Sequence, residues 1–409
     1  MLAIVVGGGP APGINGAISA ATIEAINEGL VPVGVKGGFK SLFNGDKKSI
    51  IPLTINDVSR IHTTGGSILG TSRDYMDKVE EGFRVLMKTL KSLKVRYLIT
   101  IGGDGTAFMS MWIDREAKGT ISTVHIPKTI DNDLQLPGGV PTFGYETARH
   151  YGVELVKNLM EDAKTMGRWY FVTTMGRNVG HLALGIGKAS GATLTLIPEE
   201  FPGKRLSFKK LADILEGSVL KRLSMDKNYG VAVMAEGIAD KLDIEELSRY
   251  EKLEKDETGR VRLSEIQLGR ITKTFVKNSL SKKGIEMTIV DKSIGYELRA
   301  ADPIPFDIEY TRNLGYGAVK FLRRGGSGEM IAFYEGRLTS IPFADMLDKT
   351  TNRIKIRTVD INSEIYEVGR KYMIRLEKDD LTEPGITRLS KTAHLSAAEF
   401  RKSFGYICE

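Results

Sequence analysis

The sequence predicts an α/β protein in which parallel sheets are covered by helices, and three observations lead to this class. Short apolar runs of five to eight residues, rich in β-branched or aromatic side chains, recur along the chain as buried strands do. Amphipathic stretches with apolar residues every three or four positions lie between them. The 409 residues are also too many for one ordinary core, so we expect two domains with insertions or a tail.

Each predicted strand ends in a turn of glycine, proline or polar residues. The strands cover 2–6, 30–35, 95–101, 123–127, 168–175, 193–198, 230–235 and 288–294. The clearest predicted helices cover 14–29, 79–93 and 145–163, and Gly29 is expected to cap the first of them. This alternation implies parallel strands, and ligands bind at the carboxyl ends of parallel strands in such folds.

Two regions differ from this alternation. Residues 201–275 are rich in lysine and glutamate, and we expect them to form a solvated helical insertion. Residues 375–409 are predicted to form a polar helical tail, in which Ser396 caps a helix that begins near Ala397.

The composition is that of a soluble globular protein and narrows the range of partners. Apolar residues make up 41% of the chain and charged residues 27%, and the formal net charge is +7. This charge fits a solvated lysine-rich surface or the attraction of anionic ligands, whereas no motif for nucleic-acid binding is present. The single cysteine, Cys408, rules out an intrachain disulfide and favours a cytoplasmic setting. No apolar run reaches the ~18 residues of a membrane span, and we expect no signal peptide.

Two glycine-rich turns are suited to phosphate groups. The stretch "GGGPAPGIN" at 7–15 follows a predicted strand and precedes a helix, so its N–H groups and the helix N-terminus suit an anion. A merely tight turn is the alternative, because the stretch is neither a P-loop nor a GxGxxG motif. The stretch "GGDGT" at 102–106 places Asp104 among three glycines, where it can approach a phosphate-bound Mg²⁺. The alternative is that Asp104 caps a helix that begins near Thr106.

A pair of carboxylates follows the next predicted strand. The stretch "PKTIDND" at 127–133 sets Asp131 and Asp133 two residues apart, and Lys128 supplies compensating positive charge. Transfer of a phosphoryl group to an alcohol needs a positioned carboxylate base of this kind. A polar loop with an Asx turn is the structural alternative.

Charged residues in four further motifs suit phosphate or sugar groups. Arg177 in "MGRNVGH" and Arg299 in "GYELR" can clamp phosphate groups. Glu236 in "AEG" suits a sugar hydroxyl, and Arg73 in "GGSILGTSR" can meet a transferring phosphoryl group. A surface salt bridge is the usual alternative for such an arginine or glutamate.

The ordered set of these motifs resembles the 6-phosphofructokinase family, in particular the branch that includes diphosphate-dependent enzymes. The resemblance runs from residue 4 to about 345, and NAD and diacylglycerol kinases are similar only in the GGDGT phrase. It implies two similar Rossmann-like, three-layer α/β domains with parallel-rich sheets and the active site in the cleft between them. We assign 1–138 and about 303–345 to a phosphoryl-donor domain. We assign 139–302 and about 346–409 to a sugar-phosphate domain.

The resemblance also implies a reaction, a cofactor and an assembly. A phosphoryl group would pass to the 1-hydroxyl of fructose 6-phosphate in an Mg²⁺-dependent step of glycolysis. Asp131 resembles the general base, Asp133 and Thr129 support it, and Asp104 resembles the Mg²⁺ ligand. Arg168 resembles an arginine that reaches a neighbouring subunit, which implies self-association as a dimer or tetramer.

The same resemblance assigns the remaining site residues. The catalytic set is Lys128, Thr129, Asp131, Asp133 and Arg73. The donor-binding set is Gly8, Gly9, Arg73, Gly103, Asp104, Gly105 and Thr106. The substrate-binding set is Thr129, Asp131, Arg168, Met175, Gly176, Arg177, Glu236, Tyr296 and Arg299.

Several positions depart from the family's pattern. Ser19 and Ile23 stand in place of two arginines that bind an effector nucleotide in allosteric bacterial relatives, which puts that effector site in doubt. Phe39 stands where relatives often stack the adenine of ATP on a tyrosine. Tyr296 stands where relatives usually have a histidine.

The two positions that bear on the phosphoryl donor disagree. Diphosphate-dependent relatives usually have aspartate and lysine where common ATP-dependent ones have two glycines, and this chain has Gly105 and Lys128. An aspartate at 105 would repel an α-phosphate ~4 Å away by roughly 4 kcal/mol at an effective dielectric of ~20. We therefore expect ATP as the donor, with diphosphate as the alternative. A lipid or nucleotide kinase and a non-catalytic sugar-phosphate-binding subunit are the other classes considered.

Overall fold

The structure, a computed structural model, describes the chain except for residues 73–79, 204, 249–265, 349, 352 and 409. The described chain divides into two compact units. Unit 1 comprises Met1–Ala148 and Tyr296–Arg357, and unit 2 comprises Arg149–Gly295 and Thr358–Glu409. The predicted domain boundaries lie at 138, 302 and 345, whereas the units change at 148, 295 and 357.

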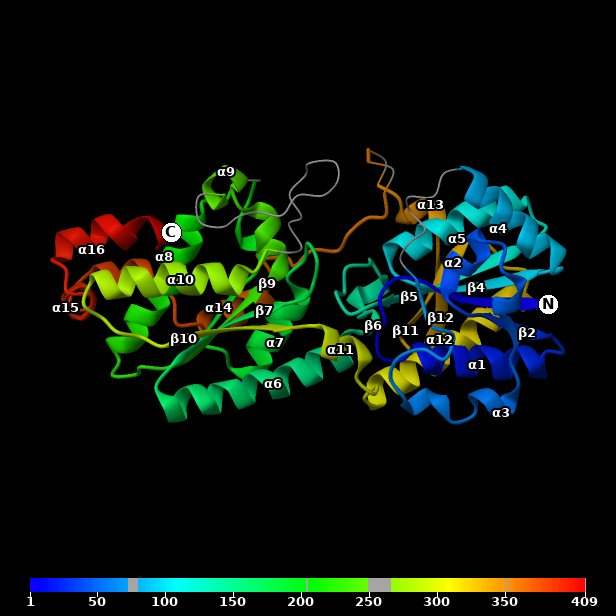
Figure 1. Ribbon diagram of the computed structural model, residues 1–409, viewed down its shortest axis with the longest axis horizontal. Coiled ribbons are helices and arrows are strands. Elements are labelled where there is room, and N and C mark those ends of the chain that lie inside the picture. The colour runs from blue at the N-terminus through cyan, green and yellow to red at the C-terminus, as the bar shows by residue number, and fades with distance from the viewer. Residues whose placement is uncertain (73–79, 204, 249–265, 349, 352, 409) are drawn as a thin grey trace. The chain divides into compact units, whose positions relative to one another are not determined.

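Unit 1 is built on a mixed, mostly parallel sheet (Figure 1). Its described strands are β1 (Leu2–Val6), β2 (Pro32–Val35), β3 (Ile50–Pro52), β4 (Tyr97–Gly102), β5 (Ser122–Thr129), β6 (Phe143–Gly144), β11 (Glu329–Tyr334) and β12 (Arg337–Pro342). They follow the order β12-β11-β5-β4-β1-β2-β3, with β6 paired to β5. The inner strands pair in parallel, while β3 and β12 are antiparallel edge strands. The predicted α/β class is confirmed.

Helices cover both faces of this sheet and produce three layers. Alternate residues of β1 point to opposite faces, so Ile4 packs with α1 and α12, whereas Val5 packs with α2, α4 and α5. The described helices of unit 1 are α1 (Ile14–Asn27), α2 (Gly38–Phe43), α3 (Ile55–Val58), α4 (Glu80–Ser92), α5 (Asp104–Ala117), α11 (Tyr296–Ala300), α12 (Pro305–Arg323) and α13 (Phe343–Met346). Short 3₁₀ turns lie at Lys47–Ser49, Ile61–Thr63 and Pro137–Gly139. Helix α6 (Tyr145–Met166) begins in unit 1 and continues in unit 2.

Unit 2 is built on a parallel sheet whose described strands follow the order β10-β7-β9-β8. These are β7 (Trp169–Thr174), β8 (Leu194–Leu196), β9 (Gly230–Ala235) and β10 (Ile289–Ile294). Its described helices are α7 (His181–Ser190), α8 (Phe208–Leu223), α9 (Ile244–Leu247), α10 (Leu268–Lys282), α14 (Glu364–Lys371), α15 (Gly385–Thr392) and α16 (Ala397–Phe404). The described 3₁₀ turns of this unit lie at Pro198–Glu200, Glu236–Lys241, Lys378–Leu381 and Gly405–Ile407.

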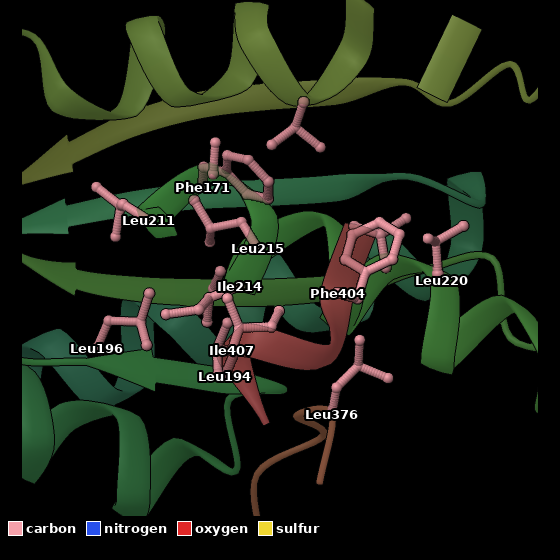
Figure 2. Close-up of a cluster of buried hydrophobic side chains, with 14 of the residues drawn as sticks. Phe171, Leu194, Leu196, Leu211, Ile214, Leu215, Leu220, Leu376, Phe404 and Ile407 are labelled. Carbon is pink, nitrogen blue, oxygen red and sulfur yellow. The ribbon is translucent and has the colours of Figure 1, made fainter. Parts of the chain in front are cut away.

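The C-terminal segment is part of the unit 2 core. Phe404 and Ile407 lie among Leu211 and Leu215 of α8 and Phe171 of β7, and all five are buried (Figure 2). The tail is therefore polar only on its outer side. Helix α16 begins at the predicted cap, because the Ser396 hydroxyl accepts the N–H of Glu399 at 3.2 Å.

The expectation of a solvated insertion at 201–275 is wrong for the elements that the structure describes there. Helix α8 is buried along most of its length, β9 lies between β7 and β8, and α10 packs on β7 and β10. The charged side chains that suggested an insertion belong in part to helices that bury their other face. The lysine- and glutamate-rich stretch 249–265 lies outside the described residues.

All eight predicted strands coincide with strands of the structure, and the three predicted helices coincide with α1, α4 and α6. Gly29, with φ of +70°, follows the end of α1 as expected. Among the described residues, none of the helices combines the length and the apolarity that a membrane crossing requires.

Candidate active site

Three loops leave the unit 1 sheet side by side. Strands β1, β4 and β5 are parallel neighbours, so the turns that follow them start at the same edge. The first two turns approach closely around one side chain, because a Cβ atom on Gly7 or Gly102 would lie 2.4 or 2.2 Å from Oγ1 of Thr106. The structure therefore brings the two glycine-rich motifs and the carboxylate pair to one edge of the sheet.

Lys128 brings positive charge to the first of these turns. Its side chain is buried, and Nζ donates a hydrogen bond to the carbonyl of Gly9. A Cβ atom on Gly8 would lie 3.3 Å from the same Nζ, and Gly8 has a φ of +81°. The Gly8–Gly9 turn therefore combines a close backbone approach with an ammonium group, which suits a bound anion.

Asp104 is the first residue of α5, where the helix N-terminus adds positive potential. It is half-buried, and the flanking Gly103 and Gly105 carry no side chain beside it. A single carboxylate in such a place suits Mg²⁺, which keeps several waters and takes further ligands from substrate phosphates. The described residues contain no group of three or more His, Cys, Asp or Glu side chains that could hold a metal ion.

The loop after β5 holds both predicted carboxylates in buried positions. Asp131 and Asp133 are only 4% and 6% exposed. The N–H of Asp131 donates to Oγ1 of Thr129 at 3.0 Å, and Oδ1 of Asn132 accepts the N–H of Thr142 at 3.1 Å. Asn132 has a φ of +59°, a left-handed conformation that asparagine tolerates better than most residues. Side-chain bonds thus hold the loop in one shape.

Arg357, which no motif indicated, holds the same loop. Its Nε donates to the carbonyl of Asn132 at 3.1 Å, and an Nη nitrogen donates to the carbonyl of Val140 at 3.3 Å. Its backbone N–H donates to the carbonyl of Asp133 at 2.8 Å. The neighbouring Ile356 also forms an isolated antiparallel β-bridge with Leu134, and no local pattern in the sequence marks this pairing.

The segment that carries Arg73 is described up to Ser72, and Arg73 itself lies outside the described residues. The carbonyl of Ser72 accepts the N–H of Gly8 at 3.0 Å, so this segment contacts the first glycine-rich turn. At its other end the N–H of Gly65 donates to Oδ1 of Asp302 at 2.8 Å, just after α11. The "GGSILGTSR" segment therefore contacts the first glycine-rich turn at Ser72 and the residues just after α11 at Gly65.

In unit 2, two predicted motifs meet at the carboxyl edge of the sheet. Strands β7 and β9 are parallel neighbours, and Met175 and Glu236 directly follow their ends. Oε1 of Glu236 accepts the N–H groups of Gly176 and Arg177 at 3.2 and 2.8 Å. Glu236 thus fixes the turn from which the exposed Arg177 extends, and its predicted contact with a sugar hydroxyl stays a prediction.

Arg168 forms a two-point ion pair within unit 2. Its Nε and one Nη donate to the two carboxylate oxygens of Asp162 on α6, each at 2.7 Å. The hydrogen bonds from Tyr170 and then from Arg168 hold the pKa of Asp162 below its usual range. The Arg168 side chain retains 26% exposure, and its predicted contact with a neighbouring subunit stays a prediction.

Tyr296 and Arg299 lie on α11 and belong to unit 1, whereas the other predicted sugar-phosphate residues between 168 and 236 belong to unit 2. Tyr296 is 77% exposed, and the guanidinium carbon of Arg299 lies 5.5 Å from the centre of its ring. This distance is within the range of a cation–π contact. That these residues share one site stays a prediction.

Two buried side chains behind the unit 1 loops, Phe39 and His125, differ from what an exposed ring at those positions could do. Phe39 has no exposed surface and packs in the core with Val5 and Leu98, so its ring cannot stack on an adenine.

His125 lies on β5, and its Nδ1 is 2.9 Å from Oγ1 of Thr100. Burial above all, with the charge of Lys128 adding to it, lowers the pKa of His125 to about 3. His125 is therefore neutral near pH 7.

The sequence model of the family described as Phosphofructokinase matches residues 1–322. This chain belongs to the phosphofructokinase family. A pyrophosphate–fructose 6-phosphate 1-phosphotransferase of Thermotoga maritima is 52% identical to it over 414 residues, which covers 100% of this chain and 99% of that protein. A protein of the same name from Naegleria fowleri is 45% identical over 418 residues, covering 100% and 96%. An ATP-dependent 6-phosphofructokinase 1 of Clostridium perfringens is 29% identical over 347 residues, covering 85% and 93%.

These phosphofructokinase relatives overturn the expectation of ATP as the donor. The two that align with the whole chain at 52% and 45% identity are named for pyrophosphate, whereas the ATP-dependent relative is 29% identical. The expectation rested on Gly105, and a missing side chain only removes an obstacle to a nucleotide. It supplies no contact that would favour one.

Solved phosphofructokinase structures share the fold. The phosphofructokinase of Pichia pastoris in the T-state has a TM-score of 0.71 at 18% identity, over 92% of this chain and 41% of that chain. The pyrophosphate-dependent phosphofructokinase of Nitrosospira multiformis has a TM-score of 0.68 at 16% identity, over 92% of both chains. These likenesses confirm the predicted two-domain α/β phosphofructokinase fold.

Proposed function

We propose that this chain is a diphosphate-dependent fructose 6-phosphate 1-phosphotransferase. The enzyme transfers one phosphoryl group of diphosphate to the 1-hydroxyl of fructose 6-phosphate, producing fructose 1,6-bisphosphate and phosphate. The observation that carries the proposal is the 52% and 45% identity, over the whole chain, to two proteins named for this reaction. The placement of the unit 1 loops at one edge of the sheet supports it.

Asp131 acts as the general base. The bond that forms joins the sugar's O1 to the transferred phosphorus, the phosphoanhydride bond breaks, and the proton of the 1-hydroxyl passes to the Asp131 carboxylate. This role is supported by the burial of Asp131 and by the hydrogen bond from its N–H to Oγ1 of Thr129, which fixes the backbone that carries the carboxylate. Asp133, buried two residues further on, supports the same loop.

Lys128 and the Gly8–Gly9 turn bind the diphosphate donor. The ammonium reaches the carbonyl of Gly9 and lies beside Gly8, so it can compensate the charge of a phosphate held by that turn. A diphosphate offers no adenine or ribose, and the buried ring of Phe39 offers no stacking surface for one. Arg73 is proposed as a further cation at the transferring group.

Asp104 is the residue that would hold Mg²⁺ at the donor site. The bound cation would neutralise charge on the donor and on the phosphoryl group that moves. On this chain, Asp104 supplies the carboxylate, and the helix N-terminus of α5 with Gly103, Gly105 and Thr106 supplies N–H groups and space for the phosphates.

The phosphate and hydroxyl groups of fructose 6-phosphate are bound by residues that the family resemblance assigns. These are Thr129, Arg168, Met175, Gly176, Arg177, Glu236, Tyr296 and Arg299. Support for Arg177 comes from the two backbone hydrogen bonds by which Glu236 fixes its turn. A guanidinium that extends from a fixed turn binds phosphate with less loss of conformational entropy.

A donor comparison tests the proposed function. The purified chain is assayed with saturating fructose 6-phosphate and Mg²⁺, with either diphosphate or ATP at matched concentrations. We expect kcat/KM to be at least about 10²-fold higher with diphosphate, since that ratio corresponds to only about 2.7 kcal/mol. Faster turnover with ATP would refute diphosphate as the preferred donor. No turnover with either donor would refute the proposal that the chain catalyses this reaction.

A further inference from the structure

Outside the predicted motifs, Arg357 makes three hydrogen bonds to the loop that carries Asp131 and Asp133. The guanidinium and the backbone of Arg357 reach the carbonyls of Asn132, Asp133 and Val140 at 3.1, 2.8 and 3.3 Å. Arg357 thus contacts the loop at the carbonyls of two consecutive residues, Asn132 and Asp133, and again at Val140, seven residues after Asp133. Arg357 also lies beyond the family match, which ends at residue 322.

The loop needs such support because of its backbone. Asn132, between the two aspartates, has a φ of +59°, and residues in this region persist only where their surroundings impose it. Thr142 braces the Asn132 side chain through its N–H, whereas Arg357 binds the Asn132 carbonyl. The guanidinium therefore restrains the Asn132–Asp133 peptide, which begins one residue after Asp131.

The surroundings of Arg357 favour a fixed guanidinium. Burial lowers the pKa of Arg357 from its usual value, and Tyr145 and Asp133 oppose that change. An arginine retains its charge even so, since its usual pKa is above 12. Two of its three bonds come from the planar fork, which a lysine cannot reproduce.

We propose that Arg357 is a positioning residue for the reaction, which holds the Asp131–Asp133 loop in its reactive shape without touching either substrate. The inference rests on the proposed function of Asp131 as the base. It predicts that loss of the guanidinium lowers kcat, because the Asp131 carboxylate moves away from its reactive position. The affinities for both substrates should change little. A misplacement of ~1 Å can cost about 10²-fold in rate.

Three variants test this role by steady-state kinetics with diphosphate and fructose 6-phosphate. We expect R357M to lower kcat by about 10²-fold and R357K by about tenfold, with each KM within about threefold of wild type. Added methylguanidinium should restore part of the kcat of R357M. The exposed Arg353, four residues earlier, gives the matched control R353M, whose kcat should equal that of wild type.

Each alternative outcome is decisive. A kcat within threefold of wild type for both R357M and R357K would overturn the proposal. A rise in either KM that accounts for the whole loss would make Arg357 a binding residue, which overturns it too. If R357M does not fold, R357K decides alone, because it keeps the charge and the stem. Wild-type turnover is measured first, so its absence refutes the proposed function and not the role of Arg357.

Discussion

At the residue scale, the burial of Asp131 makes its role testable by removing its charge alone. Asp131→Asn keeps the side-chain volume and removes the proton acceptor, so we expect kcat to fall by about 10²–10⁴-fold. The KM for fructose 6-phosphate should stay within a few-fold of wild type, because the change acts on the transition state. Steady-state kinetics measures both.

The control for this prediction is the exposed Asp345 on α13. Asp345→Asn removes the same charge from the same unit and should leave kcat unchanged. An Asp131→Asn enzyme with near-normal turnover would remove Asp131 from the role of base.

Lys128 provides a second test at this scale. Its ammonium lies beside Gly8 and binds the carbonyl of Gly9, so Lys128→Gln should weaken the binding of diphosphate. Loss of a charge-assisted hydrogen bond costs about 1.5–3 kcal/mol, which corresponds to a rise of roughly 10- to 100-fold in the KM for diphosphate. The exposed Lys91→Gln serves as control, and an unchanged KM for diphosphate in Lys128→Gln would place this lysine outside the donor site.

Single residues also show the limit of prediction from sequence. The motifs placed Asp104, Asp131 and Lys128 at strand ends, because glycine and aspartate turns after apolar runs mark such ends. The donor was predicted wrongly from Gly105, since an absent side chain excludes nothing and prefers nothing. Arg357 was not predictable, because its bonds run to backbone carbonyls more than 200 residues away.

At the scale of elements, strand β5 carries a buried histidine, His125, whose protonation bears on stability and not on the reaction. His125 is fully buried with a pKa of about 3, mainly because burial disfavours the charged imidazole. The unfolded chain takes up this proton near pH 6.5, while the folded chain does not. The free energy of unfolding therefore decreases as the pH falls from 6.5 towards 3, by about 1.4 kcal/mol per pH unit from this group alone.

The variant His125→Asn removes this contribution. We expect the free energy of unfolding of wild type to fall by about 2 kcal/mol more than that of His125→Asn between pH 6.5 and 5. Denaturant unfolding at both pH values measures this difference in slope, which does not depend on the variant's own stability. The exposed His150→Asn should behave as wild type, and equal slopes for all three proteins would contradict the burial of a neutral His125.

Elements with a strong local pattern were predictable, and those defined by distant partners were not. Strands β1, β4, β7 and β9 are continuous apolar runs because helices cover both faces of their sheets. Edge strand β3 has only three residues, one of them a proline and none of them buried, and β6 has only two residues. Helix α8 was assigned to a solvated insertion because its lysines and glutamate obscured a largely buried sequence.

At the scale of the whole molecule, each unit is completed by a segment from the far end of the chain. Residues Tyr296–Arg357 add β11 and β12 to the sheet of unit 1, and Thr358–Glu409 close the core of unit 2. A segment that completes a sheet or core formed by residues far earlier in the chain leaves no local pattern in the sequence. The domain boundaries expected from the family resemblance differ by 7 to 12 residues from those of the units.

The closing segment of unit 2 gives a prediction that separates the two cores. Phe400 on α16 is fully buried in the cluster of unit 2 side chains, and no member of that cluster belongs to unit 1. Phe400→Ala should therefore cost about 3–5 kcal/mol of stability within unit 2. Hydrogen exchange under native conditions should show faster exchange in β7, β8 and β9, while β1, β4 and β5 keep the protection of wild type. The exposed Tyr372→Ala, in the same segment, should change neither set, and equal loss of protection in both sheets after Phe400→Ala would show that the two cores unfold as one.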